Sequence, residues 1–339
     1  TAPGGTANNG PGGAGTVYLR ESDDDHGTLR VDAAGNGGGW TPLGLPLQND
    51  FTIPDAVIVR GSLTRVRPEH AGMAIEVHQG ISVSSGGRIE FADGLLSSSS
   101  LTNGVTVSTG GVLEVRGTLT ASSPVLLDAG EFRGGTLTAP DVLVVNGGVL
   151  TSSTSTATQM HMLRMDVSGT LAVDSTSRID VSSKGYLAGR TSGNTTIGGA
   201  KNHAGGTYGG LGGVSSLYGG STNIVYGDYA DPNDWGSGGG YYPGGGLMRI
   251  TAAEFLLDGS VLADGQGTQG SGSGGGIYVS VGTLRGTGLI RAQGGNADHG
   301  AGGGGRVAVY AQDYSGFDLD RITAPGGTAN NGPGGAGTV

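Results

Sequence analysis

The feature that most constrains this chain is an internal repeat that is identical over seventeen residues. The opening segment, TAPGGTANNGPGGAGTV, returns letter for letter at Thr323–Val339, which is an offset of 322 residues (323 minus 1). The match includes Pro3, Asn8 and Asn9, so it does not depend on glycine alone. Self-similarity at a fixed period indicates a repeat architecture. We therefore expect one full 322-residue period, with residues 323–339 as the start of the next.

A shorter period runs through the C-terminal third of the chain. A Gly cluster, an apolar strand, a polar turn and a second strand recur there. Units of this size cannot enclose a core of their own, so neighbouring units must stack to complete the burial. Because Val339 repeats Val17, the short period continues across the junction of the long one. The first strands match at Leu247, Ile277, Val307 and Val339, spaced 30, 30 and 32 residues apart, and the second strands match at Ile290, Ile322 and, in the next period, Leu29.

Short β-branched runs separated by Gly, Asn, Asp or Ser-Thr turns fill the rest of the chain, in units of roughly 20 residues between positions 51 and 185. No window of helical length keeps an apolar face free of Gly and Pro. Stacked units with two or three strands each and no crossover helix predict an all-β fold, a parallel β-helix or β-solenoid, with Gly at its corners. The alternative is an antiparallel sandwich or barrel. It is disfavoured because Asn-Gly or Asp-Gly hairpins do not link the strands systematically.

The periodicity divides the chain into three segments. Residues 1–183 are predicted to be solenoid coils, with a Pro-containing connection near 41–54. Residues 184–246 interrupt the pattern with a Gly- and Tyr-rich stretch, which we expect to be a loop inserted in a coil. A structureless loop of this length is unusual in a compact domain, so we expect its aromatic residues to pack on the solenoid flank. Residues 247–339 are predicted to be coils again, with 323–339 opening the next repeat.

Composition excludes several classes of function. Glycine supplies 74 of the 339 residues, and the formal net charge is −10. The chain has two lysines, Lys184 and Lys201, and no basic run, so we expect no nucleic-acid partner. Cysteine is absent, which excludes disulfides and thiolate metal sites. No apolar stretch reaches the ~18 residues of a membrane helix, so we expect no membrane span in this segment.

The weak candidates for a metal site are Asp228, Asp231 and Asp234, three residues apart in the Gly-rich stretch. Closely spaced oxygen ligands suit Ca²⁺, but the spacing matches neither an EF-hand nor a nonapeptide array. A turn over residues 231–234 explains the same side chains. The run Asp23-Asp24-Asp25-His26 is interpreted as a solvated loop tip. We therefore predict no metal site, no cofactor and no catalytic residue, with Ca²⁺ as the one cation that the three carboxylates would suit.

The main rival class is an enzyme, because polysaccharide lyases and hydrolases also use β-helices. Asp166, Asp174 and Asp180 could supply the paired carboxylates that such chemistry needs. They are explained equally well as outward-facing polar positions of alternating strands. An enzyme would also not need its whole body repeated with identity. We therefore predict that the protein is not an enzyme. The alternative is a polysaccharide-degrading enzyme (lyase or hydrolase) or a carbohydrate-binding surface module.

Several passages resemble recurring blocks of giant, repeat-rich secreted and cell-surface proteins of bacteria. They are GGGGRVAVYAQDYSGFDLDRITAPGG, GGAGTVYL, IDVSSKGYLAG and YGDYADPNDWGSGGG. The resemblance implies a right-handed β-helix, an extracellular or cell-surface location and a structural or adhesive role. It supplies no catalytic residues.

The function expected from the sequence is that of a structural repeat in an extracellular β-solenoid filament or a giant surface adhesin. The partner expected is the protein itself, stacked end to end with identical repeats, and surface polysaccharide or a host cell surface is a further candidate. Neither end of the sequence carries a recognisable cap, so we expect Val307 to stack near the next copy's Val17. Without the Gly-rich stretch the remaining residues make roughly 9–13 coils, or an axial repeat of roughly 43–62 Å at ~4.8 Å per strand.

Overall fold

The computed structural model describes all residues, 1–339, and the chain is all-β. Beside its strands it contains two 3₁₀ helices of three residues each, η1 (Ser192–Asn194) and η2 (Leu319–Arg321). The all-β class predicted from the short strand signals is therefore confirmed. Neither helix has the length and apolarity that crossing a membrane would require.

Most strands have three to five residues, as the short β-branched runs predict. The strands of the first half are β1 (Thr16–Leu19), β2 (Thr28–Asp32), β3 (Trp40–Leu43), β4 (Asp50–Ile53), β5 (Ala56–Arg60), β6 (Arg65–Pro68), β7 (Ala74–Val77), β8 (Ile81–Ser84), β9 (Arg88–Phe91), β10 (Leu95–Ser98), β11 (Val105–Ser108), β12 (Val112–Ala121), β13 (Val125–Asp128), β14 (Glu131–Ala139), β15 (Val142–Val145) and β16 (Val149–Thr151). The others are β17 (Met162–Val167), β18 (Thr170–Val173), β19 (Arg178–Asp180), β20 (Leu247–Leu257), β21 (Ser260–Leu262), β22 (Gly276–Gly286), β23 (Leu289–Arg291), β24 (Ala297–His299), β25 (Arg306–Phe317), β26 (Ile322–Thr323) and β27 (Ala329–Asn331).

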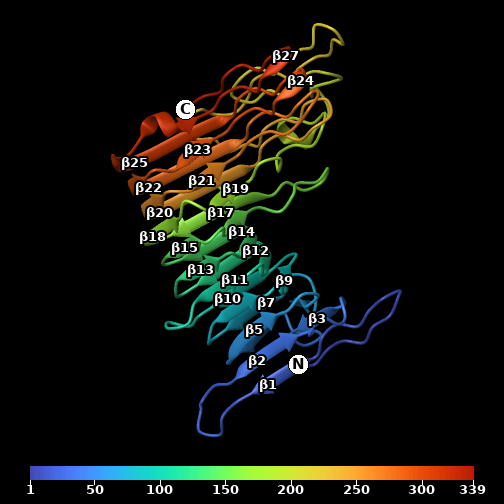
Figure 1. Ribbon diagram of the computed structural model, residues 1–339, viewed down its shortest axis with the longest axis vertical. Coiled ribbons are helices and arrows are strands. Elements are labelled where there is room, and N and C mark those ends of the chain that lie inside the picture. The colour runs from blue at the N-terminus through green and yellow to red at the C-terminus, as the bar shows by residue number, and fades with distance from the viewer. The chain divides into compact units, whose positions relative to one another are not determined.

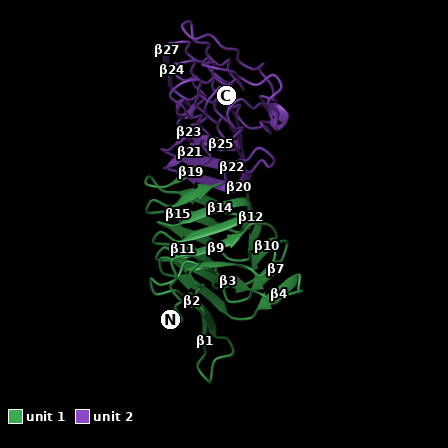
Figure 2. Cartoon of the chain, turned by 90° about the vertical axis from the view of Figure 1, so that its right-hand side faces the viewer, with its two compact units in different colours: residues 1–151, 165–178 green, residues 152–164, 179–339 purple.

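The chain forms two compact units, coloured separately in Figure 2. Unit 1 comprises residues 1–151 and 165–178, and unit 2 comprises residues 152–164 and 179–339. The division of the chain at residues 184 and 247, expected from the periodicity, stays a prediction.

In unit 1 the strands stack in parallel as three columns. Figure 1 shows successive strands, such as β11, β13 and β15, side by side. Column 1 is β2, β5, β8, β11, β13, β15 and β18. Column 2 is β3, β6, β9, the first half of β12, the first half of β14, and β16. Column 3 is β4, β7, β10 and the second halves of β12 and β14. A long, mostly parallel sheet of this kind is compatible with a β-solenoid.

The core of unit 1 is built from equivalent apolar residues lying directly above one another. Alternate side chains of a strand face the same way, and in most strands of unit 1 every second residue is buried, as in β5 and β8. In column 1 both Val59 and Val83 are completely buried. The inward positions two residues earlier also lie opposite one another from strand to strand: they are Leu29, Val57, Ile81, Val105, Val125, Val142 and Leu171.

One corner between columns 1 and 2 recurs with the same local chemistry. At Ser85-Gly86 and Thr109-Gly110 both residues have positive φ, between 47° and 80°. The N–H two positions after each Ser or Thr, on Gly87 and Gly111, donates back across the turn over 2.9 Å. This is a type I′ turn, which favours Gly, Asn and other small polar residues at its centre. The final Gly is needed for a different reason: a Cβ at Gly111 would lie 2.4 Å from the carbonyl oxygen of Val83 in the layer beneath.

In unit 2 the long strands β20, β22 and β25 pair in parallel, as do β21, β23 and β26. The expected equivalences of Ile277 with Val307 and of Ile290 with Ile322 are confirmed. The expected equivalence of Leu247 with Ile277 is wrong by one residue, because Met248 lies opposite Ile277. The run Leu247-Met248 offers two adjacent apolar residues, so the sequence did not distinguish the two registers.

Much of the rest of unit 2 consists of glycine backbones that lie close beside one another. A Cβ at Gly272 would lie 1.9 Å from the oxygen of Pro243, one at Gly302 1.9 Å from that of Gly272, and one at Gly334 1.9 Å from that of Gly302. Only glycine permits this approach of backbone to backbone. The Gly-rich segment 184–246 takes part, since the amide of Gly206 donates to the Ser271 oxygen and its oxygen accepts from Gly303, at 2.8 and 2.9 Å.

Candidate assembly interface

The two copies of the seventeen-residue segment share two backbone hydrogen bonds. In the first copy Gly12 N–H donates to the Gly5 oxygen over 2.9 Å and Gly15 N–H donates to the Ala2 oxygen over 2.7 Å. The second copy repeats both bonds, from Gly334 to Gly327 at 2.9 Å and from Gly337 to Ala324 at 2.8 Å. The equivalent glycines Gly10 and Gly332 both have positive φ, 98° and 82°. The segment therefore forms the same two backbone hydrogen bonds in two different surroundings.

The two copies bury different residues. In the first copy Ala14 is buried and Gly5 is exposed, whereas in the second copy the equivalent Ala336 is exposed and Gly327 is buried. The first copy lies against the segment that follows it: Gly13 forms a parallel bridge with Gly39, and the Thr41 hydroxyl donates to the Ala14 oxygen.

The second copy lies against the segment that precedes it. Gly327 N–H donates to the Gly302 oxygen over 2.8 Å, and Thr338 forms a parallel bridge with Arg306. Residues 329–331 form β27 on β24, whereas the equivalent residues 7–9 are exposed and belong to no strand. The two copies thus show two different neighbours that the same segment can pack against.

An apolar groove of about 370 Å³ runs along β25, on the side of that strand away from β22. Its lining includes Val307, Val309, Tyr314, Ile322 and Val339. Val309 is half-buried, although the residues stacked with it in β20 and β22, Ile250 and Val279, are completely buried. The groove is therefore a position where the apolar column of unit 2 is left partly uncovered.

The strand that follows the first copy takes a different course. β1 pairs with β2 in the antiparallel sense, with Thr16 opposite Val31 and Tyr18 opposite Leu29. Among the strand pairs with a defined register it is the one antiparallel pair, and the others are parallel. Tyr18 and Leu19 are 52% and 55% exposed there, so the strand buries little of its apolar surface.

The three candidate metal ligands do not converge. Asp231 forms an ion pair with Arg249 at 2.7 Å, and Asp228 accepts the amide of Ala230 in a local turn. Asp234 accepts hydrogen bonds from the Tyr186 hydroxyl at 2.6 Å and the Ser192 hydroxyl at 2.7 Å. Burial, with this hydrogen bond to Asp234, raises the pKa of Tyr186. No group of three or more His, Cys, Asp or Glu side chains in the chain is placed to hold a metal ion.

The other charged candidates lie in turns, at the end of a strand or on a strand. The run Asp23–His26 occupies the exposed loop between β1 and β2. Asp174 accepts hydrogen bonds from the amides of Asn146 and Thr176 and from the Thr176 hydroxyl, at 2.7 to 2.9 Å. Burial by itself would raise the pKa of Asp174, but these bonds and one from Ser177 lower it to about 2. A general acid needs a raised pKa, so Asp174 is suited to holding a turn. Asp180 likewise accepts the amide of Ser182, and Asp166 lies on β17.

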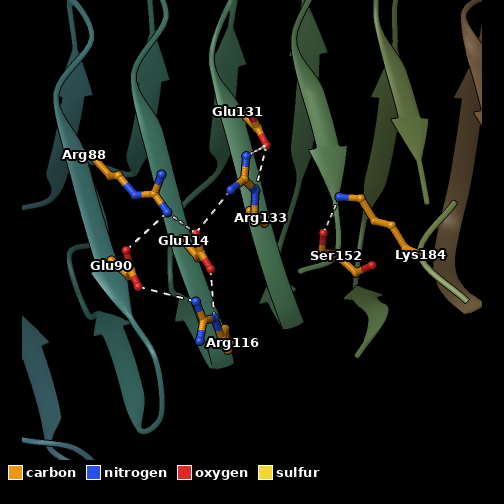
Figure 3. A network of polar contacts seen from close by, with 8 residues as sticks. All are labelled: Arg88, Glu90, Glu114, Arg116, Glu131, Arg133, Ser152 and Lys184. Carbon is orange, nitrogen blue, oxygen red and sulfur yellow. Dashed lines mark hydrogen bonds and ion pairs between the residues drawn. The ribbon is translucent and has the colours of Figure 1, made fainter. Parts of the chain in front are cut away.

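Sequence reasoning missed an ion-pair ladder on the outer face of column 2 (Figure 3). Glu114 on β12 is only 2% exposed and lies 2.5 Å from Arg88 on β9, 2.8 Å from Arg116 on its own strand and 3.4 Å from Arg133 on β14. Burial would raise the pKa of Glu114, but the hydrogen bond from Arg116 and the three positive charges outweigh it and lower the pKa. The signal was available: Arg88-x-Glu90, Glu114-x-Arg116 and Glu131-x-Arg133 recur in successive layers, and the register places Glu114 opposite Glu90 on one side and Arg133 on the other.

A cavity of about 440 Å³ lies beside Trp40 in unit 1 and is lined by Arg67, Glu69, His70 and Asp93 among others. The guanidinium groups of Arg65 and Arg67 lie 5.8 and 5.7 Å from the centre of the Trp40 ring. Both ring nitrogens of His70 contact backbone oxygens, those of Ala71 and Gln48. The cavity thus combines one aromatic ring with several charged groups.

Comparison with known proteins found no match to a protein-family model, to a curated protein or to a solved structure. The function is therefore inferred from the geometry of the chain.

Proposed function

We propose that this chain is a structural, non-catalytic repeat of an extracellular β-solenoid filament or giant surface adhesin, which stacks end to end with identical repeats. In this proposal each period is a right-handed β-helix with a Gly-rich loop, and it continues into the next period through the repeated segment. One observation carries the proposal: two identical segments close the same two backbone hydrogen bonds, while one packs on the segment that follows it and the other on the segment that precedes it.

The physical reason is the open edge of a stacked sheet. A strand at such an edge presents unpaired N–H and C=O groups, and a solenoid end also presents apolar side chains. Repeat proteins remove both by adding another unit or a cap. The groove along β25 and the exposed residues 5–10 present the two ends that a further period would cover.

An extracellular or cell-surface location is part of the proposal. It is supported by the resemblance of the Gly-rich blocks to secreted bacterial surface proteins. The proposal includes no cofactor. Surface polysaccharide or a host cell surface is the further partner that an adhesin of this type would contact.

The test compares the 339-residue protein with a two-period protein, in which residues 1–339 are followed directly by residues 18–339. In a stacked solenoid the stability is a sum of unit terms and interface terms. We therefore expect the two-period protein to unfold at a higher temperature than the single chain, in a calorimetric scan at matched concentration of periods. If the two-period protein unfolds at the same temperature as the 339-residue protein, with twice its unfolding enthalpy, then no interface forms between the periods.

A second candidate, binding of a carbohydrate, rests on the cavity beside Trp40. An aromatic ring with charged neighbours in a cleft is a common arrangement for holding a polar ligand. Titration of the protein with acidic and neutral oligosaccharides, followed by tryptophan fluorescence, tests it. Binding that is lost in Trp40→Ala but kept in Trp235→Phe supports this function, and an unchanged signal with every oligosaccharide removes it.

A further inference from the structure

We propose that β1 is an exchangeable strand with two alternative partners. In the arrangement described above it lies antiparallel on β2. In a tandem repeat, the β1 of the following period lies instead in the groove of β25 and pairs with that strand in parallel. This inference rests on the proposed end-to-end stacking and names the surface and the strand that perform it.

The register of the alternative pairing follows from the second copy. Thr338 is opposite Arg306, Thr338 N–H donates to the Gly305 oxygen and Val307 N–H donates to the Thr338 oxygen. Because Thr338 and Val339 repeat Thr16 and Val17, this contact is the beginning of a β1 strand on β25. When this parallel pairing is continued residue by residue, Tyr18 lies opposite Ala308 and Leu19 lies opposite Val309.

The alternation of side chains favours this position. On β2, Thr16 and Tyr18 lie opposite Val31 and Leu29, whose column partners Val59 and Val57 are buried, so Val17 and Leu19 point the other way. A shift by one residue exchanges the two faces of a strand.

On β25 the same strand would turn Val17 and Leu19 inward, over Val307 and Val309. Ile277 and Val279 of β22 lie beneath those two residues and are completely buried. The sequence Thr-Val-Tyr-Leu therefore has Val17 and Leu19 at inward positions only in the parallel arrangement.

The exchange also frees the edge of β2. Val261, Ile290 and Ile322 are stacked in β21, β23 and β26, and the short period makes Leu29 the next member of that series. With β1 on β25, the β2 of the following period can lie on β26, with Leu29 near Ile322. In the single chain β1 occupies that edge and covers groups that a neighbour would otherwise pair, which limits uncontrolled association.

Engineered disulfides test the exchange, and the chain offers a clean background because it has no cysteine. In the two-period protein we introduce Ala308→Cys in the first period with Tyr18→Cys in the second. Residues opposite each other on neighbouring strands lie within the Cα separation that a disulfide needs. We expect this pair to oxidise to completion.

The matched control is Tyr18→Cys with Leu29→Cys, placed either in the first or in the second period of the same protein. We expect it to cross-link in the first period, where β1 lies on β2, and not in the second. Cross-linking of residues 18 and 29 in the second period would overturn the exchange, as would the absence of a bond between residues 308 and 18. Calorimetry of the same protein decides separately whether the periods stack at all.

A second variant, Leu19→Asp, distinguishes the two positions without a cross-link. In the 339-residue protein Leu19 is more than half exposed, so we expect the midpoint of unfolding to stay unchanged. In the second period of the two-period protein the same change buries a charge, so we expect amide exchange at first-period Val309 to speed up by roughly tenfold or more. Equal exchange rates in the variant and the parent protein would contradict the inward position of Leu19.

Discussion

At the scale of single residues, this fold depends on positions where layers meet. Some of them were predictable, because glycine at a corner and alternating Val, Ile and Leu have local signatures. Others depend on neighbours about twenty residues away in sequence, such as the carboxylate of Glu114 between guanidinium groups from three strands. A single strand shows only an alternating charge, so the ladder becomes visible only when the layers are aligned.

The ladder predicts a pH dependence. Because the pKa of Glu114 is lowered in the folded protein, its stabilising contribution is complete above its ordinary value of 4.5 and is lost as the pH falls through the lowered value. We expect Glu114→Gln to reduce the free energy of unfolding by about 2 kcal/mol at pH 7, since it removes the central charge of a buried network whose arginines are partly exposed.

The difference between Glu114→Gln and the parent protein should shrink below pH 4.5. Denaturant unfolding between pH 7 and pH 3 measures it. Glu21→Gln, in the exposed loop after β1, is the control and should cost nothing measurable. A constant difference across the pH range would show that the Glu114 charge is not responsible.

The corner glycines give a matched pair of substitutions. Gly111→Ala places a methyl group 2.4 Å from the Val83 oxygen, so the two layers must move apart. We expect a loss of about 2 kcal/mol or more. Gly110 has positive φ and open space around it, so Gly110→Asn should lose less than about 1 kcal/mol. Equal losses of stability in thermal unfolding would mean that backbone conformation, and not the close approach to the layer beneath, determines which residue is tolerated.

At the scale of elements, the strands were predictable and their neighbours in the Gly-rich region were not. Alternating apolar residues marked short strands, and the short period correctly paired Ile277 with Val307. The register error at Leu247 arose where two adjacent apolar residues fit the pattern equally. Glycine stretches carry no side-chain pattern, so nothing in the sequence shows which of them lie together. The contacts of Gly206 with Ser271 and Gly303 are known only from the structure.

Those contacts change the expected result of a deletion. Periodicity alone suggests that residues 184–242 form a removable loop. In the structure Tyr208, within this segment, is completely buried and lies 5.4 Å from the Arg306 guanidinium. The amides of Gly206 and Gly209 also donate hydrogen bonds to the carbonyl oxygens of Ser271 and Gly304. We therefore expect the deletion to lower the midpoint temperature of unfolding markedly. Circular dichroism during heating measures this, and an unchanged midpoint would show that the segment is a free insertion.

At the scale of the whole molecule, the tandem architecture stays a prediction from the sequence, and the structure describes the two copies of the segment that would join its periods. The seventeen-residue identity alone indicated a period of 322 residues. It could not indicate that the two copies bury different residues, because identical sequences carry no information about their neighbours. The candidate interface therefore combines a repeat that the sequence shows with a groove and a strand register that only the structure shows.

The most direct test of the central claim is electron microscopy, with helical averaging, of a protein that contains several consecutive periods. Column 1 of unit 1 has seven stacked strands, and unit 2 has three long strands. If the proposed filament stacks them as ten successive layers, its axial repeat is roughly 48 Å at ~4.8 Å per layer. We expect a thin, unbranched fibre with strands perpendicular to its axis and this repeat. A row of separate globules, one per period, or strands running along the axis would contradict the claim.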